Sequence, residues 1–214
     1  MSLDKFGQLR RVAPDVSRET FERLLVYETL FFKWSKSFNL ASPATLHEFW
    51  SRHILDSAQL FVIKQPEGIW LDIGSGGGLP GVVTAIMMRN TEGSHVHLIE
   101  SNGKKVAFLR TALLETGAAG TVHLSRIEDA PKIIPAVQVI TARAVSGLGN
   151  LFELTSPWLL NGATALFHKG QDFQREIDET RSAWNADLLK HVSMVDPSSV
   201  ILEIRSLARQ TTIN

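Results

Sequence analysis

Residues 71–81, LDIGSGGGLPG, form a glycine-rich loop between an apolar run and an amphipathic stretch. Gly74, Gly76 and Gly78 allow a strand to turn sharply while backbone N–H groups come close to a ligand. Pro80 suits the first position of a following helix, where its missing N–H would be unpaired in any case. Strand, loop and helix therefore follow in the order that a nucleotide- or nucleoside-binding loop requires. This order favours a binding loop over a flexible turn without a ligand.

Two kinds of ligand are compatible with this loop. Gly76, Gly78 and Gly81 match the dinucleotide fingerprint, and Glu100 lies near the ~20-residue offset at which a ribose-binding acid is expected. Asp72, however, places a charge in a strand that dehydrogenases normally fill with apolar residues. A carboxylate there suits a cationic ligand group such as an amino acid's ammonium, which favours S-adenosylmethionine (AdoMet).

From residue 69 onwards, short apolar runs alternate with amphipathic stretches. This alternation predicts an α/β domain with a mainly parallel sheet and helices on both faces. The last two runs are joined by the short link 196–199, which predicts an antiparallel hairpin because a parallel pair needs a longer connection. The predicted strands are 69–73, 95–100, 121–124, 137–141, 164–169, 191–196 and 199–207, and the predicted helices are 81–90, 104–117, 149–160 and 174–189.

These elements predict a Rossmann-like AdoMet-dependent methyltransferase fold, a seven-stranded mainly parallel sheet with an antiparallel terminal hairpin, over residues 69–214. The hairpin fits that fold better than a dehydrogenase, and no second domain remains for a hydride acceptor. Residues 1–68 read as helical, with apolar residues three and four apart over 19–38 and a second predicted helix over 47–63. We expect this N-terminal helical segment to pack on the core.

Composition excludes several classes of protein. The chain has no cysteine, so disulfides, thiolate metal sites and cysteine nucleophiles are excluded. Lys plus Arg and Asp plus Glu both number 22, so a global basic field gives no support to nucleic-acid binding, although a local basic face is compatible with this balance. No apolar run approaches the ~20 residues that span a bilayer, and the N-terminus lacks an apolar signal core. We expect a cytoplasmic protein with no membrane partner, no metal and a monomeric state.

If the chain is a methyltransferase, the residues that it lacks narrow the methyl acceptor. Methylation of pyrimidine C5 by the usual route needs a cysteine nucleophile. Methylation of an exocyclic amine usually relies on an Asn/Asp-Pro-Pro-aromatic loop after the fourth strand, where this chain has TARAV at 141–145. A ring nitrogen with a free lone pair attacks the sulfonium methyl directly, so the enzyme mainly supplies alignment and a suitable pocket.

Taken together, these residues resemble the glucose-inhibited division protein B family, the 16S ribosomal RNA guanine-N7 methyltransferases. The similarity covers nearly the whole chain, and the pairing of RHILDS with the glycine loop is more specific than either motif alone. The departures are His168, where the family often has an apolar residue, and Ala41, where it often has threonine. The motifs are KWSKSFNLAS (33–42), RHILDS (52–57), LDIGSGGGLPGVV (71–83), ESNGKKVAFLR (100–110), SRIED (125–129), TARAV (141–145) and HKGQ (168–171).

The resemblance implies 16S ribosomal RNA, or the small ribosomal subunit, as partner and AdoMet as methyl donor. It places Gly74 and Leu79 beside the methionine part of AdoMet, and Glu100 near the ribose. It places Ile127 and Glu128 at the adenine. The resemblance also puts Arg143 at the mouth where AdoMet meets RNA. We include Asp72 and Gly76 in the predicted binding site because they belong to the glycine loop itself.

Arg143 and Lys169 are the predicted catalytic residues, because Arg143 follows the end of the predicted strand 137–141, Lys169 ends the predicted strand 164–169, and sites in open α/β sheets are built at strand ends. Lys169 could hold an RNA phosphate or be a solvated lysine. Arg52, His53 and Asp56 could share a helix face, as an RNA-facing or domain-bridging cluster or as a helix-packing salt bridge. The rival functions are an NAD(P)-dependent oxidoreductase and a non-catalytic RNA-binding module with the AdoMet fold.

Overall fold

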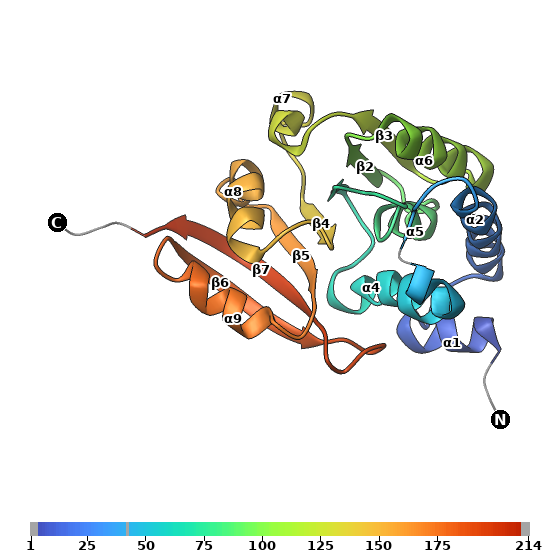
Figure 1. Ribbon diagram of the computed structural model, residues 1–214, viewed down its shortest axis with the longest axis horizontal. Helices are drawn as coiled ribbons and strands as arrows, with labels where there is room; N and C mark the ends of the chain where they lie inside the picture. Colours follow the sequence, from blue (N-terminus) through green and yellow to red (C-terminus); the bar gives the residue numbers. More distant parts are fainter. Residues whose placement is uncertain (1–3, 42, 211–214) are drawn as a thin grey trace.

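The computed structural model describes residues 4–41 and 43–210. The start of the predicted segment 1–68, the end of the predicted domain 69–214 and Ser42 of the KWSKSFNLAS motif lie outside the described residues. Seven strands form one sheet in the order β3-β2-β1-β4-β5-β7-β6 (Figure 1). The first five strands run parallel, whereas β7 is antiparallel to both β5 and β6. The strands are β1 Ile69–Ile73, β2 His95–Glu100, β3 Gly120–Leu124, β4 Val139–Arg143, β5 Thr164–Lys169, β6 Trp184–Val192 and β7 Val200–Arg209.

This topology confirms the predicted fold, a mainly parallel seven-stranded sheet with an antiparallel terminal hairpin. One predicted helix, 174–189, is wrong in its second half. Helix α9 (Phe173–Thr180) ends early, and β6 begins at Trp184. From Trp184 buried or half-buried positions alternate with exposed ones, which is the period of a strand. The hairpin therefore joins longer strands through the loop 193–199 rather than through a four-residue turn.

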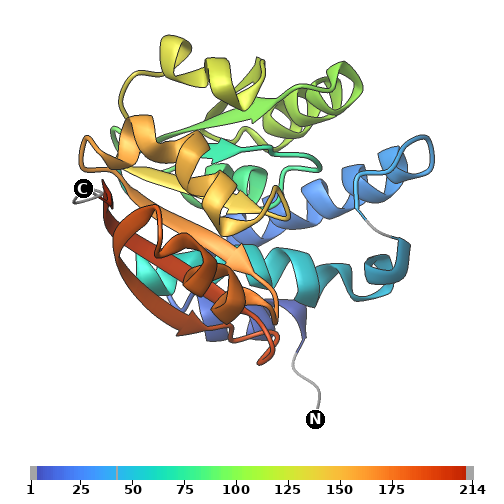
Figure 2. The same ribbon diagram turned by 60° about the vertical axis from the view of Figure 1, so that its left-hand side comes forward.

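Helices cover both faces of the sheet, and each face has its own apolar core. Trp70, Leu98 and Val139 point to the face covered by the N-terminal helices with α5 and α6. Leu71 and Ile140 point to the face covered by α7, α8 and α9. Figure 2 shows α8 and α9 in front of the sheet and the N-terminal helices behind it. The helices are α1 Lys5–Val12, α2 Arg18–Ser35, α3 Asp56–Ala58, α4 Leu60–Ile63, α5 Gly81–Met87, α6 Gly103–Thr116, α7 Ala130–Ile133, α8 Leu148–Leu159 and α9.

The predicted second helix, 47–63, is broken into short pieces. A 3-10 helix, η1 (Pro43–Glu48), and a π-helix, η2 (Trp50–Leu55), precede α3 and α4. The π-helix contains most of the RHILDS motif, and such irregular turns are frequent at functional sites. A further short helix, η3 (Ile127–Asp129), follows β3.

The N-terminal helices join the core of the sheet through aromatic side chains. The rings of Phe31 and Phe49 lie 4.5 Å apart, and Phe31 meets Phe108 of α6 edge-on at 5.8 Å. One apolar cluster thus contains residues from both predicted segments. The division of the chain at residue 68 stays a prediction. None of the helices in the described residues combines the length and the apolar composition that a membrane span requires.

Candidate functional site

The glycine loop leaves β1 and turns sharply into α5. Gly74, Gly76 and Gly78 all have positive φ angles, between 56° and 85°, which favour glycine. A Cβ on Gly78 would lie 2.4 Å from Cγ2 of Val82, so that position also has no room for a side chain. Helix α5 begins at Gly81, which leaves Pro80 at the N-cap rather than at the first helical position.

Tyr27 of α2 supports the loop from below, a contact that the sequence reasoning missed. Its hydroxyl donates to the carbonyl oxygen of Gly77 at 2.5 Å, and the side chain is fully buried. A Cβ on Gly77 would lie 2.7 Å from both the Leu40 carbonyl oxygen and Cε2 of Phe31. The only available signal was that Tyr27 is the single tyrosine of the chain, a lone hydroxyl in an otherwise apolar aromatic stripe.

Asp72 lies beneath the loop and not on its surface, with 1% of its side chain exposed. Its Oδ1 accepts a hydrogen bond from Oγ1 of Thr141 at 2.7 Å, whereas Oδ2 is buried with no hydrogen-bond partner among the described residues. Burial raises the pKa of Asp72 to about 6, against the lowering effects of Ser75, Thr141, the Gly81 backbone and the Arg143 charge. The carboxylate that was expected to face a cationic ligand group is therefore buried directly under the turn.

Glu100 ends β2 and joins the loop to the start of α6. Its Oε2 accepts from the N–H of Gly76 at 2.9 Å, and its Oε1 accepts from the N–H of Asn102 at 2.8 Å. The side chain is largely buried. Because a carboxylate oxygen has two lone pairs, Glu100 retains acceptor capacity for hydroxyl groups beside the loop.

Apolar side chains from two other segments meet the loop at Gly74. A Cβ on Gly74 would lie 2.9 Å from Cγ2 of Val145 and 3.8 Å from Cδ1 of Ile127. Leu79 is buried within the loop. Glu128, by contrast, is exposed on η3. Of the residues expected around AdoMet, Gly74, Ile127 and Leu79 therefore lie at the loop, whereas the Glu128 side chain lies in solvent.

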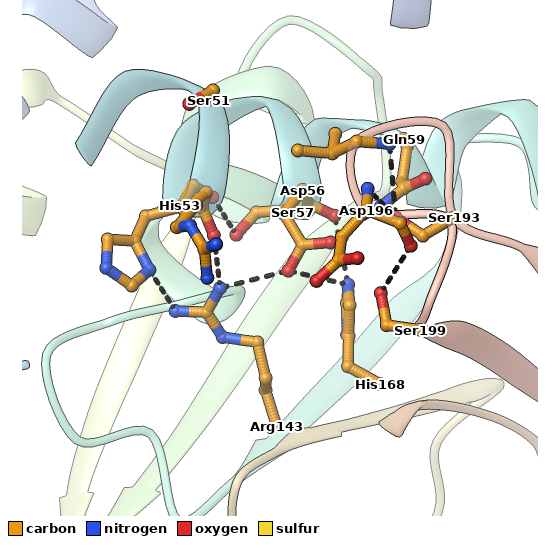
Figure 3. Close-up of polar contacts among 12 residues, drawn as sticks. Ser51, His53, Asp56, Ser57, Gln59, Arg143, His168, Ser193, Asp196 and Ser199 are labelled. Carbon is orange, nitrogen blue, oxygen red and sulfur yellow. Dashed lines mark hydrogen bonds and ion pairs between the residues drawn. The ribbon is translucent and has the colours of Figure 1, made fainter. Parts of the chain in front are cut away.

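Arg143 ends β4 and reaches across to the RHILDS motif (Figure 3). Its Nη1 donates to the carbonyl oxygen of Arg52 and to Oδ2 of Asp56, each at 3.0 Å. Its Nη2 lies 2.8 Å from Nδ1 of His53. Burial, followed by the nearby Arg143 charge, lowers the pKa of His53 to about 4, so this imidazole is neutral and accepts from the guanidinium.

Asp56 connects this group to β5. Nε2 of His168 lies 2.9 Å from the backbone oxygen of Asp56, and Oδ1 of Asp56 accepts from Nε2 of Gln59 at 2.7 Å. Burial lowers the pKa of His168, which keeps its ring neutral as well. The RHILDS motif therefore bridges the N-terminal helices and the ends of β4 and β5. This is the domain-bridging arrangement, one of those expected for Arg52, His53 and Asp56.

Lys169 ends β5 and is buried, with 8% of its side chain exposed, so it is not a solvated lysine. Its Nζ lies 2.6 Å from Oε2 of Glu176 and donates to the Ser146 carbonyl oxygen at 2.9 Å. The same Glu176 oxygen accepts from the N–H of Leu148 at 2.7 Å and so caps α8. This pair fixes the segment 144–147, and no sequence signal pointed to Glu176.

The segment after β4 has unusual backbone geometry. Ala144 has φ 55°, and it is the only residue other than glycine with a positive φ in the described chain. Such conformations cost energy and cluster at functional sites. The turn at Ala144 separates Arg143, which contacts the RHILDS motif, from Val145, which covers Gly74.

A pocket of about 320 Å³ opens beside Arg143, at the ends of β4 and β5. It lies between the RHILDS motif and the β6–β7 loop. This is the edge of an open α/β sheet at which ligands bind. The pocket is lined by Arg52, His53, Asp56, Arg143, Ala144, His168, Lys169, Gly170, Glu176, Val195, Asp196, Ser199 and Val200.

No group of three His, Cys, Asp or Glu side chains that could hold a metal ion occurs in the part of the chain that the structure describes. His95 and His97 of β2 lie beside His123 of β3, where His97 Nδ1 and His123 Nε2 are 3.0 Å apart. Burial lowers the pKa of all three, so they are neutral rings on the face of the sheet, away from the glycine loop.

Comparisons with known proteins agree with this arrangement. A family model described as rRNA small subunit methyltransferase G (GidB) matches residues 20–204. Proteins named ribosomal RNA small subunit methyltransferase G from Brucella canis and Brucella ovis are 55% and 54% identical over 212 residues, which is 99% of this chain and 100% of theirs. A mutant of MtNAS in complex with S-adenosylmethionine has a TM-score of 0.58 at 11% identity, covering 86% of this chain and 75% of that one. The fibrillarin/Nop5p complex gives 0.56 at 12% identity, covering 73% and 82%, and both show the fold alone.

Proposed function

The chain belongs to the GidB family of small-subunit ribosomal RNA methyltransferases, and we propose that it transfers a methyl group from AdoMet to N7 of a guanine in 16S ribosomal RNA. It is an AdoMet-dependent ribosomal RNA methyltransferase, the class after which its relatives are named. The comparisons favour neither an NAD(P)-dependent oxidoreductase nor a non-catalytic RNA-binding module.

The residues around the glycine loop fit AdoMet, which supplies an electrophilic methyl group on a sulfonium when bound. We propose that Gly74 and Leu79 lie beside its methionine part, with Gly76 and the buried Asp72 shaping the loop. Glu100 would accept from the ribose hydroxyls with the lone pairs that Gly76 and Asn102 leave free. Ile127, half-buried beside Gly74, would cover the adenine, with Glu128 at its outer edge.

We propose that the methyl acceptor enters the pocket beside Arg143. Arg143 and Lys169 end neighbouring parallel strands and line the same pocket, which supports assigning both to the transfer step. Arg143 would contact the acceptor nucleotide and AdoMet at their junction. Lys169 holds the segment 144–147 through Ser146 and would place its charge behind the acceptor.

Guanine N7 has a free lone pair, so this reaction needs no residue to remove a proton before attack. The chain instead has to align the base and exclude water from the junction. The polar residues at the site are already ordered by mutual contacts, Arg143 by three acceptors and Lys169 by two. Such preorganisation is what a direct, in-line displacement requires of its enzyme.

The single observation that carries this proposal is the placement of the glycine loop and the Arg143 pocket at the same edge of the sheet, joined by the turn at Ala144. The test is transfer of tritiated methyl from AdoMet to small ribosomal subunits, and to their extracted RNA, from cells that lack this protein. We expect label in 16S ribosomal RNA, and mapping should place it on guanine N7. Label on another atom or on protein would contradict the proposal.

We further propose that the chain acts as a monomer in the cytoplasm, where small subunits are assembled. Light scattering of the purified chain should give a mass near 23.7 kDa. A stable dimer would contradict the monomeric state without affecting the proposed chemistry.

A further inference from the structure

Three carboxylates line the Arg143 pocket, and two of them are paired with cations. Asp56 pairs with Arg143 at 3.0 Å and Glu176 pairs with Lys169 at 2.6 Å. Asp196, the third, has no ion pair with any described residue. Arg52, which also lines the pocket, pairs with Glu48 outside it, and its charge helps to lower the pKa of Asp196. Asp196 is thus the one lining carboxylate without an ion pair among the described residues, and it is available to a ligand.

Asp196 is carried by the β6–β7 loop, which is fastened to the N-terminal helices by Gln59. The Gln59 side chain is 2% exposed; its Oε1 accepts from the N–H of Met194 at 2.8 Å, and its Nε2 donates to Oγ of Ser193 at 3.1 Å. Oγ of Ser193 in turn accepts from the N–H of Asp196 at 3.1 Å. Because Gln59 also donates to Asp56, a single buried amide orders both sides of the pocket.

The two oxygens of the Asp196 carboxylate have different surroundings. Oδ1 accepts from the N–H of Ser198 at 3.0 Å and from its hydroxyl at 2.7 Å, which closes the turn of the loop. These hydrogen bonds hold the pKa of Asp196 below its usual range, so the group is an ionised acceptor at neutral pH. Oδ2 has no hydrogen-bond partner among the described residues. Figure 3 shows the half-buried side chain reaching towards Asp56 and His168.

We propose that Asp196 is a specificity-determining residue whose free oxygen accepts hydrogen bonds from N1–H and the 2-amino group of the acceptor guanine. This inference rests on the proposed function, and it names the group that reads the base. Enzymes that modify a base in RNA read its Watson–Crick edge in a pocket. Adenine has no hydrogen on N1, so an acceptor at this place selects guanine. N7 lies on the far side of the ring system and stays free for methylation.

The test compares guanine with inosine, which lacks the 2-amino group but keeps N1–H, O6 and N7. Small subunits are reconstituted with 16S ribosomal RNA that carries either base at the mapped position, and kcat/KM for methyl transfer is measured. We expect the natural chain to prefer guanine about 10- to 100-fold, the effect of one hydrogen bond to a charged group. Asp196→Asn should lower transfer to guanine by a similar factor and bring the guanine/inosine ratio close to one.

Ser198→Ala is the matched control, because it removes a hydrogen bond from Oδ1 and leaves the carboxylate in place. We expect this variant to keep the guanine preference. Thermal unfolding of both variants shows whether either substitution disturbs the folded structure. The guanine preference of the natural chain is measured without any variant, so this part of the test does not depend on variants that fold. A natural chain without a guanine preference, or an Asp196→Asn variant that retains it, would overturn the inference. A natural chain that does not label guanine N7 at all would instead overturn the proposed function, and the inference with it.

Discussion

Nη1 of Arg143 donates to Oδ2 of Asp56 at 3.0 Å, although 87 positions of sequence separate the two residues. Asp56 begins α3 in the N-terminal helices, whereas Arg143 ends β4 at the edge of the sheet. Both side chains are mostly buried, with 16% and 17% exposed. This ion pair makes the orientation of Arg143 depend on the N-terminal helices, although these helices are not part of the sheet.

Replacement of Asp56 by alanine should release Arg143 and leave its charge without a partner. We expect the free energy of unfolding to fall by about 1–3 kcal/mol, since breaking a largely buried pair leaves one charge uncompensated. Methyl transfer should fall more than AdoMet binding, because the polar contacts of Asp56 go to Gln59, Arg143 and His168 rather than to the glycine loop. Denaturant unfolding, calorimetric AdoMet binding and the tritium assay provide the three readouts.

A double-mutant cycle separates the pair from other effects of losing Asp56. Arg143→Gln and Asp56→Ala should be strongly non-additive in stability, with a coupling energy of about 1–2 kcal/mol. Additive losses would show that each residue acts through other contacts, such as Gln59 for Asp56 and His53 for Arg143.

The pair of Lys169 and Glu176 yields a second prediction. Glu176→Gln keeps an acceptor for the N–H of Leu148 but removes the countercharge of Lys169. We expect a loss of about 1–3 kcal/mol in unfolding free energy and a lower kcat, because the segment 144–147 loses part of its support. Glu179→Gln on the same helix is the control: that side chain is exposed, and its change should stay within about 0.5 kcal/mol.

Much of this architecture was predictable because its signals are local. The glycine loop lies within eleven consecutive residues, and the alternation of apolar runs marked all of the parallel strands. The first strand of the hairpin was predicted at 191–196, but β6 spans 184–192, so most of the predicted strand lies in the loop 193–199. The start of β6 was missed because residues 174–189 contain both a helical and an alternating pattern, and the sequence alone does not locate the switch after Thr180. The alternation of Trp184, Ala186 and Leu188 was the unused signal.

Site residues at the ends of strands could be predicted from the sequence, whereas residues that reach the site through contacts with distant segments could not. Glu100 and Lys169 end strands, as expected, and Arg143, expected just after the strand 137–141, is the last residue of β4. Tyr27 and Glu176 reach the site from helix surfaces, and helical periodicity shows which face is buried without showing what the face meets. Asp72 was placed at a ligand-facing position, but the register of β1 turns its side chain under the loop towards Thr141.

A third prediction compares Gly76 and Gly78, two glycines of the loop that both have positive φ angles but have different surroundings. A Cβ on Gly76 would meet only the Gly74 carbonyl oxygen, at 3.7 Å, so Gly76→Ala carries only the strain of a positive φ, about 1–2 kcal/mol. Gly78→Ala adds overlap with Val82 and Leu109, which should cost about 1–3 kcal/mol more. Denaturant unfolding without AdoMet measures the difference. Equal losses would contradict this account of the loop.

The fourth prediction concerns pH and follows from the buried carboxyl of Asp72. Its pKa is about 6 in the folded protein, against 3.8 for an unperturbed aspartate, so between these values the folded state holds more protons than the unfolded state. Stability from this group is therefore fully present below about pH 4 and is lost as pH rises through 6. With about 1.4 kcal/mol for each unit of pKa, the loss is about 3 kcal/mol.

Asp72→Asn should remove this pH dependence, because the amide keeps an oxygen for Thr141 and carries no charge. The stability of this variant relative to the natural chain should rise between pH 4 and 7, as measured by denaturant unfolding without AdoMet at each pH. Asp129→Asn is a control without such a change, since Lys132 lowers the pKa of the exposed Asp129 from 3.8 and any contribution of that carboxylate to stability is already complete above about pH 4. A flat difference for Asp72→Asn across this range would show that the carboxyl beneath the glycine loop titrates normally.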